Sequence, residues 1–294
     1  MKLTMNFTEL PDALITDLDN TLVSTKESSK LIGLLKEYKA LTELKNTLDK
    51  LGSICYQTYG YPFKLIIVTG NSFDYVMAKL EVYSLWSSPT LEVIVASENG
   101  LYTQSLRRGI LWKFEPSADY LRRTSDLMSY ALKRHRGRFY LQGNLVRITF
   151  KALDSRYFDE ELVPELIELG RKLGFELYEG GGLKEGRVGT MYWHKGDALD
   201  IDPFKGRIGG REAIFEGKSF PVRELSKEVA YALVVGDSLN DLPMFQEAHS
   251  LGYSCFVVKN HSLGNKLPPY VKVLEEPLAR GVNLLLLRVL REWG

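Results

Sequence analysis

Two aspartate-bearing segments at opposite ends of the chain constrain its fold most. Asp17-Leu18-Asp19-Asn20-Thr21-Leu22 follows the apolar run Ala13-Leu14-Ile15, and Gly236-Asp237-Ser238-Leu239-Asn240-Asp241 follows Ala232-Leu233-Val234-Val235. Short runs of Val, Ile and Leu are typical of buried strands in a parallel sheet. Ligands of such sheets bind at the carboxyl ends of the strands. Carboxylates that converge there repel one another unless a cation joins them, and oxygen ligands suit Mg²⁺. The pattern therefore predicts an α/β fold with a Mg²⁺ site at one sheet edge.

The first and last thirds of the chain alternate strand and helix patterns. Expected strands are Ala13–Leu18, Leu65–Val68, Val93–Ala96, Ala232–Val235, Tyr253–Val258 and Val271–Leu274. Expected helices are Ser28–Leu51, Phe73–Tyr83, Arg207–Phe215, Pro243–Ala248 and Gly281–Trp293. Such alternation predicts a parallel sheet with right-handed crossovers.

The pattern changes after the turn dipeptide Asn99-Gly100. Helices are expected at Ser117–His135 and Asp159–Leu173, a hairpin at Arg138–Phe150, and further strands at Phe175–Tyr178, Val188–Trp193 and Ala198–Ile201. This mixture predicts an antiparallel sheet with helices on one face. We therefore expect an α/β core at 1–100 and 199–294, interrupted by an inserted α+β domain at 101–198.

Composition excludes several classes of function. A formal net charge of +1 argues against nucleic-acid binding by bulk electrostatics. No apolar run reaches the roughly 18 residues of a membrane span, and the first residues lack the apolar stretch of a secretory signal. Cys55 and Cys255 lie in apolar or aromatic surroundings, so we interpret them as reduced core thiols of a cytoplasmic protein.

The Asp17/Asp19 pair suits phosphoryl transfer. A carboxylate beside Mg²⁺ can attack a phosphoryl group and form an aspartyl-phosphate. A second carboxylic acid two residues on can protonate the leaving oxygen and then deprotonate the attacking water. The alternative is a polar turn between strand and loop.

Two further segments complete this pattern. Thr69-Gly70-Asn71-Ser72 offers a hydroxyl and free backbone N–H groups that suit a phosphate, although Thr and Ser are also ordinary helix caps. In the second acidic segment, Asp237 and Asp241 can hold a metal directly or through water. An acidic loop that caps the next helix is the alternative.

A lysine is expected to neutralise the phosphoryl oxygens and the crowded carboxylates. Two Lys-Gly pairs are candidates, Lys195-Gly196 and Lys205-Gly206. We predict Lys205, because it follows an expected strand and Pro203 at the return to the core. Either lysine could instead be a solvated surface residue.

Together these segments resemble the four ordered motifs of the haloacid dehalogenase (HAD) superfamily of phosphatases, and the resemblance covers the whole chain. The motif segments are Asp17-x-Asp19-x-Thr21, Thr69-Gly70, Lys205 and Gly236-Asp237-x-x-Asn240-Asp241. Ser97-Glu98-Asn99-Gly100 and Leu199-Asp200-Ile201-Asp202-Pro203 resemble the entrance and exit of the large α/β cap of the Cof-type branch. The first motif is also similar to the sucrose-phosphate phosphatase and mannosyl-3-phosphoglycerate phosphatase subgroup.

The resemblance implies a Rossmann-like core, Mg²⁺, an aspartyl-phosphate intermediate and a role for each motif residue. Asp17 would be nucleophile and metal ligand, and Asp19 the acid/base that also gives its backbone carbonyl to Mg²⁺. The other implied roles are phosphate binding by Thr69, Gly70 and Lys205, metal ligation by Asp237, action through the metal shell by Asp241, and positioning of lysine or phosphate by Asn240.

Three features depart from the family pattern. The interval from Asp17 to Thr69 is 52 positions (69 − 17), which predicts an extra helical element. The interval from Lys205 to Asp237, 32 positions (237 − 205), is also long. Asn71 stands where sugar-phosphate members often carry an arginine.

The leading hypothesis is a Mg²⁺-dependent phosphatase of a small phosphorylated metabolite, a sugar phosphate or a phosphorylated sugar acid. A phosphomutase of the same fold, which returns the phosphoryl group to its substrate, is the alternative, and a phospho-accepting receiver protein is a third class. In such enzymes the cap selects the leaving group. Arginine and lysine suit a second anionic group, although each basic side chain could also be a solvated surface charge. The candidate substrate contacts are Asn71, Arg147, Lys184, Arg187 and His194.

Overall fold

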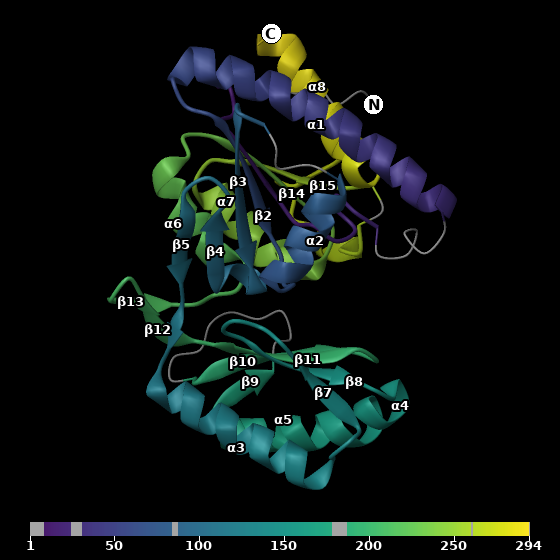
Figure 1. The fold of residues 1–294 in the computed structure, drawn as a ribbon, viewed down its shortest axis with the longest axis vertical. Helices are drawn as coiled ribbons and strands as arrows, with labels where there is room; N and C mark the ends of the chain where they lie inside the picture. The colour runs from purple at the N-terminus through teal and green to yellow at the C-terminus, as the bar shows by residue number, and fades with distance from the viewer. Residues whose placement is uncertain (1–8, 25–30, 84–87, 178–186, 260, 294) are drawn as a thin grey trace. The chain divides into compact units, whose positions relative to one another are not determined.

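The computed structural model describes residues 9–24, 31–83, 88–177, 187–259 and 261–293 (Figure 1). The chain divides into two compact units. The core unit comprises Met1–Leu111 and Lys218–Gly294, and the cap unit comprises Trp112–Gly217. The cap unit at 112–217 thus interrupts the sequence of the core unit, where the sequence analysis had placed the insertion at 101–198.

The described part of the core unit is built on an eight-stranded sheet with the order β16-β15-β14-β1-β2-β3-β4-β5. Its parallel strands are apolar runs: β1 Ala13–Thr16, β2 Phe63–Val68, β3 Leu91–Ser97, β14 Ala232–Gly236, β15 Ser254–Val257 and β16 Lys272–Val273. The edge beyond β3 is formed by β4 Tyr102–Ser105 and β5 Gly109–Lys113. Thr16 of β1 pairs with Val235 of β14 and with Ile67 of β2. The segments that follow these three strands therefore meet at one edge of the sheet.

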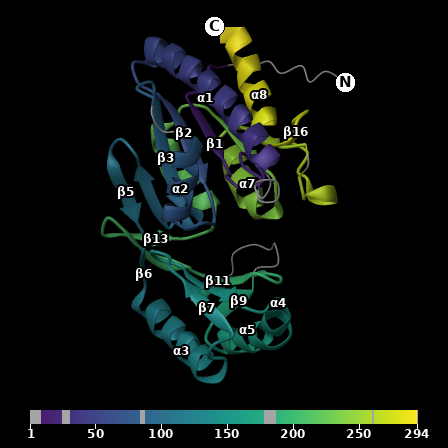
Figure 2. The ribbon, with the colours of Figure 1, turned by 45° about the vertical axis from the view of Figure 1, so that its right-hand side comes forward.

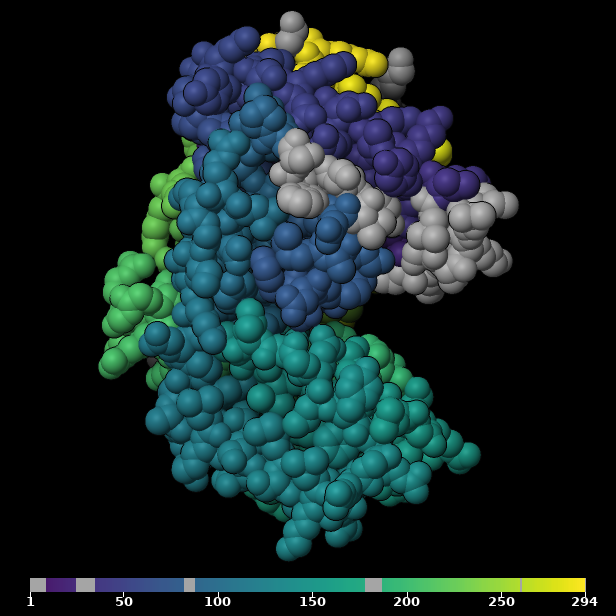
Figure 3. Space-filling model, viewed as in Figure 1, coloured from purple at the N-terminus to yellow at the C-terminus, as the bar shows by residue number. Residues whose placement is uncertain are grey.

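Helices cover both faces of this sheet. A single apolar cluster joins three of them to one face: α1 Leu31–Tyr59, α2 Phe73–Tyr83 and α8 Leu278–Trp293. Figure 3 shows the side of the core unit on which α1 and α2 lie. On the opposite face lie α6 Ser219–Leu225 and α7 Leu242–Ser250 (Figures 1 and 2). The 29-residue α1 lies in the long interval between Asp17 and Thr69, and its Thr47 hydroxyl donates to Asn283 Oδ1 of α8 at 2.6 Å.

The cap unit combines a five-stranded sheet, in the order β7-β8-β11-β10-β9, with helices on one face. The strands are β7 Phe139–Gln142, β8 Ile148–Ala152, β9 Phe175–Leu177, β10 Gly189–His194 and β11 Ala198–Pro203. The helices are α3 Ala118–Arg134, the short α4 Ser155–Tyr157, the π-helical turn Phe158–Leu162 and α5 Val163–Lys172. Tyr120, Phe150 and Phe175 form part of the apolar cluster between helices and sheet. The predicted hairpin is confirmed, since Gln142 of β7 pairs with Thr149 of β8.

One predicted element near the end of the cap was wrong. The expected helix Arg207–Phe215 is a hairpin of β12 Lys205–Ile208 and β13 Arg211–Ile214, which joins β6 Glu115–Pro116 in a small sheet. Gly209 and Gly210 form its turn with φ of +51° and +78°, values that interrupt a helix and that glycine adopts without strain. The predicted strand Ala198–Ile201 is present as β11, which pairs antiparallel with β8 and β10 in the cap sheet.

The remaining composition-based expectations concern burial and membranes. Cys55 and Cys255 are both buried, as predicted for core residues. Among the described helices, none combines the length and apolarity needed to cross a bilayer.

Candidate active site

The segment after β1 places two carboxylates at the sheet edge. Asp17 continues the sheet pairing, because its N–H donates to the carbonyl of Val235 at 3.0 Å, and its side chain is buried. The chain then turns sharply: the N–H groups of Leu22 and Val23 both donate to the carbonyl of Leu18. This turn carries Asp19 beside the neighbouring strand β2.

The segment after β14 adds two more carboxylates. The Asp241 carboxylate folds back over the strand end, where its Oδ2 accepts hydrogen bonds from the N–H of Asp237 at 2.8 Å and of Ser238 at 3.0 Å. A Cβ on Gly236 would lie 2.6 Å from that oxygen, so only glycine permits this approach. Asp237 Oδ1 accepts from the Thr21 hydroxyl at 3.4 Å, which links the two acidic segments.

The lysine beside these carboxylates is Lys218, and the prediction of Lys205 placed it wrongly. Lys218 Nζ donates to Asp17 Oδ1 at 2.8 Å and to Asp241 Oδ1 at 2.7 Å, and its side chain is buried. Lys205 is an exposed residue of β12 in the cap unit, and Lys195 is likewise exposed there. Lys218 is 19 positions before Asp237 (237 − 218), and this shorter spacing, together with the Gly217-Lys218 pair before α6, is the signal that could have identified it.

Among the residues that the structure describes, three buried carboxylates share one lysine and form a site short of positive charge. Asp17, Asp237 and Asp241 each offer an oxygen within 4.8 Å of the others. Burial, with Asp241 and Asp237 adding negative charge, raises the pKa of Asp17 to about 8 although Lys218 opposes the shift. Burial and Asp241 raise the pKa of Asp237 to about 6. Burial disfavours the ammonium of Lys218, but Asp17 and Asp241 outweigh it and raise its pKa. A divalent cation with oxygen ligands would relieve this repulsion, so the residues fit Mg²⁺.

The segment after β2 lies next to the Asp19 turn. Thr69 is buried, and its hydroxyl accepts from the backbone N–H of Asn71 at 3.2 Å. The Asn71 side-chain amide donates to Asp19 Oδ2 and, at 3.3 Å, to the Thr69 hydroxyl. Gly70 is partly exposed between them, and Asn240 is exposed on the turn Leu239–Asp241. The structure therefore joins Asn71 to the predicted acid/base residue Asp19.

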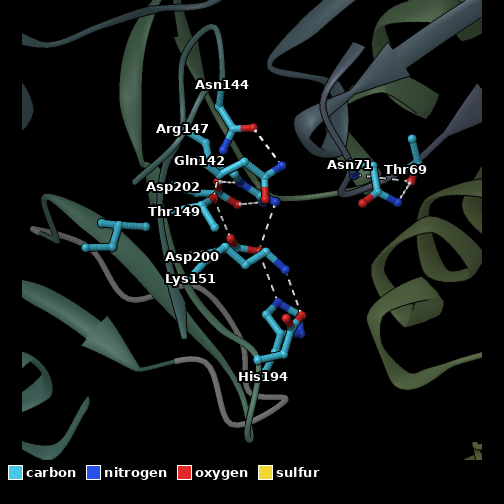
Figure 4. Close-up of polar contacts among 12 residues, drawn as sticks. Thr69, Asn71, Gln142, Asn144, Arg147, Thr149, Lys151, His194, Asp200 and Asp202 are labelled. Carbon is cyan, nitrogen blue, oxygen red and sulfur yellow. Dashed lines mark hydrogen bonds and ion pairs between the residues drawn. The ribbon is translucent and has the colours of Figure 1, made fainter. Parts of the chain in front are cut away.

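The cap unit holds a polar cluster on the sheet face opposite α3 and α5 (Figure 4). Its centre is Arg147, whose guanidinium forms two 2.7 Å hydrogen bonds with Asp202 and one of 3.0 Å with Asp200. All three side chains are buried. Thr149 donates to Asp200 Oδ1 at 2.6 Å, and His194 Nε2 lies 3.0 Å from Asp200 Oδ2. Burial opposes the charge of Asp200, but Arg147 and His194 outweigh it and lower its pKa to about 2.

The other predicted cap contacts differ in their surroundings. Arg187 stacks its guanidinium over the ring of Phe204, 4.3 Å from the centroid, and burial lowers its pKa. Its Nε is buried and has no hydrogen-bond partner among the described residues. Lys184 lies outside the described residues. Arg147 is thus neutralised within the cap, whereas Arg187 forms no ion pair with an acidic side chain in the part of the cap that the structure describes.

Comparison by sequence finds no related protein: no family model matches the chain, and no curated protein does. Comparison by structure finds solved phosphatases and a hydrolase that share the fold. The sucrose-phosphatase from Synechocystis sp., solved with sucrose and phosphate, has 18% identity and a TM-score of 0.54, over 94% of this chain and 97% of that one. A putative HAD/COF-like hydrolase from Plasmodium vivax has 13% identity and a TM-score of 0.58, over 96% of each chain.

A third solved structure agrees with these two. The C-terminal domain of trehalose-6-phosphate phosphatase from C. albicans has 14% identity and a TM-score of 0.53, over 94% of this chain and 91% of that one. At such identities the likeness establishes the fold alone, a Rossmann-like core with an inserted α/β cap.

Proposed function

We propose that this chain is a Mg²⁺-dependent phosphomonoesterase that hydrolyses a small phosphorylated metabolite, a sugar phosphate or phosphorylated sugar acid, through an aspartyl-phosphate on Asp17. The observation that carries the proposal is the contact of the Lys218 ammonium with both Asp17 and Asp241, in a cluster that Asp237 completes. Buried carboxylates crowded around one lysine cost stability. Such a cluster suits phosphoryl transfer, in which negative charge must be held and neutralised.

In the first half-reaction an oxygen of Asp17 attacks phosphorus, and the bond from phosphorus to the leaving oxygen breaks. Asp19 transfers its proton to that oxygen, so the leaving group departs as a neutral alcohol. Lys218 holds Asp17 in place and offsets the negative charge of the phosphoryl oxygens, while the Thr69 hydroxyl and Gly70 N–H bind them.

In the second half-reaction water attacks the same phosphorus atom. Asp19, now a carboxylate, takes the proton of the water, and the bond between phosphorus and Asp17 breaks to release inorganic phosphate. Asp17, Asp237 and Asp241 would hold Mg²⁺, with the Asp19 backbone carbonyl. When bound, the ion neutralises carboxylate and phosphoryl charge and orients the two reacting oxygens.

The polar face of the cap unit supports a hydroxyl-rich leaving group. Its central guanidinium is satisfied by Asp200 and Asp202, so it has no unpaired charge to offer a second anion. Hydroxyl and amide groups on the same face suit sugar hydroxyls: the Asn144 amide, for instance, donates to Thr149 at 2.7 Å. If the substrate is a sugar acid, Arg187 is the residue we assign to its carboxylate.

A panel of phosphorylated sugars and sugar acids, assayed for phosphate release with Mg²⁺ or with chelator, tests the proposal. We expect turnover of at least one sugar ester that requires Mg²⁺ and is absent in Asp17→Asn. Activity that persists in chelator or in Asp17→Asn would contradict it. Arg187→Met should weaken hydrolysis of a sugar-acid ester and spare a neutral sugar ester.

A further inference from the structure

Both carboxylate oxygens of Asp19 accept hydrogen bonds from residues 71–75, which lead from β2 into the first turn of α2. The Asn71 amide donates to Oδ2, and the Tyr75 hydroxyl donates to Oδ1 at 3.1 Å. Tyr75 lies in the first turn of α2, and the adjacent pairing of β1 with β2 brings that turn beside the Asp19 loop. The mechanism above gives Tyr75 no role, and no sequence motif pointed to it.

These two donors are themselves held in place. The Tyr75 ring packs against the core cluster of the unit, so its hydroxyl is aimed by a fixed ring. The backbone carbonyl of Asn71 accepts from the N–H of Glu98 at 2.9 Å, and the backbone carbonyl of Thr69 accepts from the N–H of Asn99 at 2.7 Å. Glu98 and Asn99 both adopt left-handed φ values, +52° and +59°. This backbone conformation is strained for residues other than glycine, and the two hydrogen bonds help to hold it.

The chemistry of the donors distinguishes the two Asp19 oxygens. A side-chain amide nitrogen can only donate, so Oδ2 must remain an acceptor when Asp19 is protonated. The transferable proton is then carried by Oδ1. Oδ1 keeps a lone pair that accepts from the Tyr75 hydroxyl, so the proton on Oδ1 is free to reach the leaving oxygen. Tyr75 therefore stays bonded to Asp19 before and after proton transfer.

We propose that Asn71 and Tyr75 are positioning residues that fix the orientation of Asp19 and direct its proton through Oδ1. The inference rests on the proposed function, because it assumes that Asp19 is the acid/base. A misoriented acid should lower kcat/KM most for a substrate whose leaving oxygen must be protonated, such as an alkyl phosphate. It should lower kcat/KM little for p-nitrophenyl phosphate, whose leaving group departs without a proton.

The test compares kcat/KM of Tyr75→Phe and Asn71→Ala on a sugar or alkyl phosphate and on p-nitrophenyl phosphate. This ratio reports only the steps up to release of the leaving group, so the second half-reaction does not enter it. We expect a loss of about tenfold to a hundredfold on the alkyl ester, the range for one hydrogen bond to a charged group, and less than about threefold on the aryl ester.

Tyr102→Phe is the matched control. The substitution removes a hydroxyl that donates to Gln104 at 2.7 Å and makes no hydrogen bond to Asp19. The Tyr102 ring lies in the same unit, 5.3 Å from the ring of Phe73. It should leave the ratio between the two esters unchanged. Equal losses on both esters in Tyr75→Phe and Asn71→Ala, or a changed ratio in Tyr102→Phe, would overturn the positioning role.

Asp19→Asn separates this inference from the proposed function. If Asp19→Asn spares the alkyl ester, or if the unaltered protein hydrolyses neither ester, the acid role fails and the positioning role fails with it. If Asp19→Asn loses the alkyl ester selectively but neither Tyr75→Phe nor Asn71→Ala does, only the positioning role is refuted. The double variant Asp19→Asn/Tyr75→Phe should be no slower than Asp19→Asn alone, since both changes act through one proton.

Discussion

Replacing Lys218 by methionine should disable the site for every phosphate ester. Methionine keeps an unbranched side chain one atom shorter than that of lysine, but it removes the charge that contacts Asp17 and Asp241. All substrates share the transferred phosphoryl group, so we expect kcat/KM to fall by roughly 10²–10³ on sugar and aryl esters alike, the cost of one electrostatic stabiliser.

The same change should destabilise the Mg²⁺-free protein. It leaves buried carboxylates without their cation, which typically costs about 3–5 kcal/mol. For a unit of about 150–250 residues this corresponds to a fall in Tm of roughly 6–20 °C. Saturating Mg²⁺ should recover part of this loss, because a bound cation replaces the missing charge, so activity is measured on protein shown to be folded by a thermal melt.

Lys205→Met is the matched control, since Lys205 is exposed on β12. It should change neither Tm nor the rate on either ester. A fully active Lys218→Met protein, or a Lys205→Met protein that is inactive on both esters, would refute the assignment of the lysine.

Three further predictions follow from the same contacts. Asp17→Asn should abolish phosphate release while the protein stays folded, because an amide is a poor nucleophile; substantial activity in a folded variant would exclude Asp17. Burial raises the pKa of Asp17 to about 8, so the Mg²⁺-free fold should lose stability as pH rises from about 4 through 8. The apparent Kd for Mg²⁺ should fall by up to about tenfold per pH unit between pH 6 and pH 8, because protons compete with the ion for the carboxylate. Calorimetric titrations that give the same Kd at pH 6 and at pH 8 would contradict this. Arg147→Met should destabilise the cap unit by about 3–5 kcal/mol, because it strands buried Asp200 and Asp202, whereas Arg156→Met, which breaks an exposed pair with Glu160, should melt like the unaltered protein.

The sequence was sufficient for the parts of this fold that depend on local pattern. Buried runs such as Ala232–Val235 are strands because few alternatives bury so much apolar surface, and the carboxylates that follow them had to meet at one edge once the strands were parallel. Asp17, Asp237 and Asp241 were predicted as a group for this reason, and the structure brings them together.

The sequence was insufficient where a contact depends on how distant elements pack. Arg207–Phe215 was predicted to be helical, and that error moved the end of the cap and with it the lysine from position 218 to position 205. The Gly209-Gly210 turn was the local sign that a hairpin was the better interpretation.

The polar contacts of the cap and of α2 follow from register. Arg147 meets Asp200 and Asp202 because β8 and β11 pair with Thr149 opposite Asp200, and no motif encodes that offset. The Tyr75 hydroxyl reaches Asp19 only because β1 and β2 are neighbours. Such contacts require the folded sheet.

The central claim, a phosphoryl group carried on Asp17, is tested most directly with the Asp19→Asn variant. With p-nitrophenyl phosphate and Mg²⁺, phosphorylation of the enzyme needs no acid, but hydrolysis of the aspartyl-phosphate lacks its base. The intermediate should therefore accumulate, and acid quenching followed by peptide mass spectrometry should find one phosphoryl group, on Asp17. Steady turnover with no phosphorylated peptide, or a phosphoryl group on any other residue, would contradict the account.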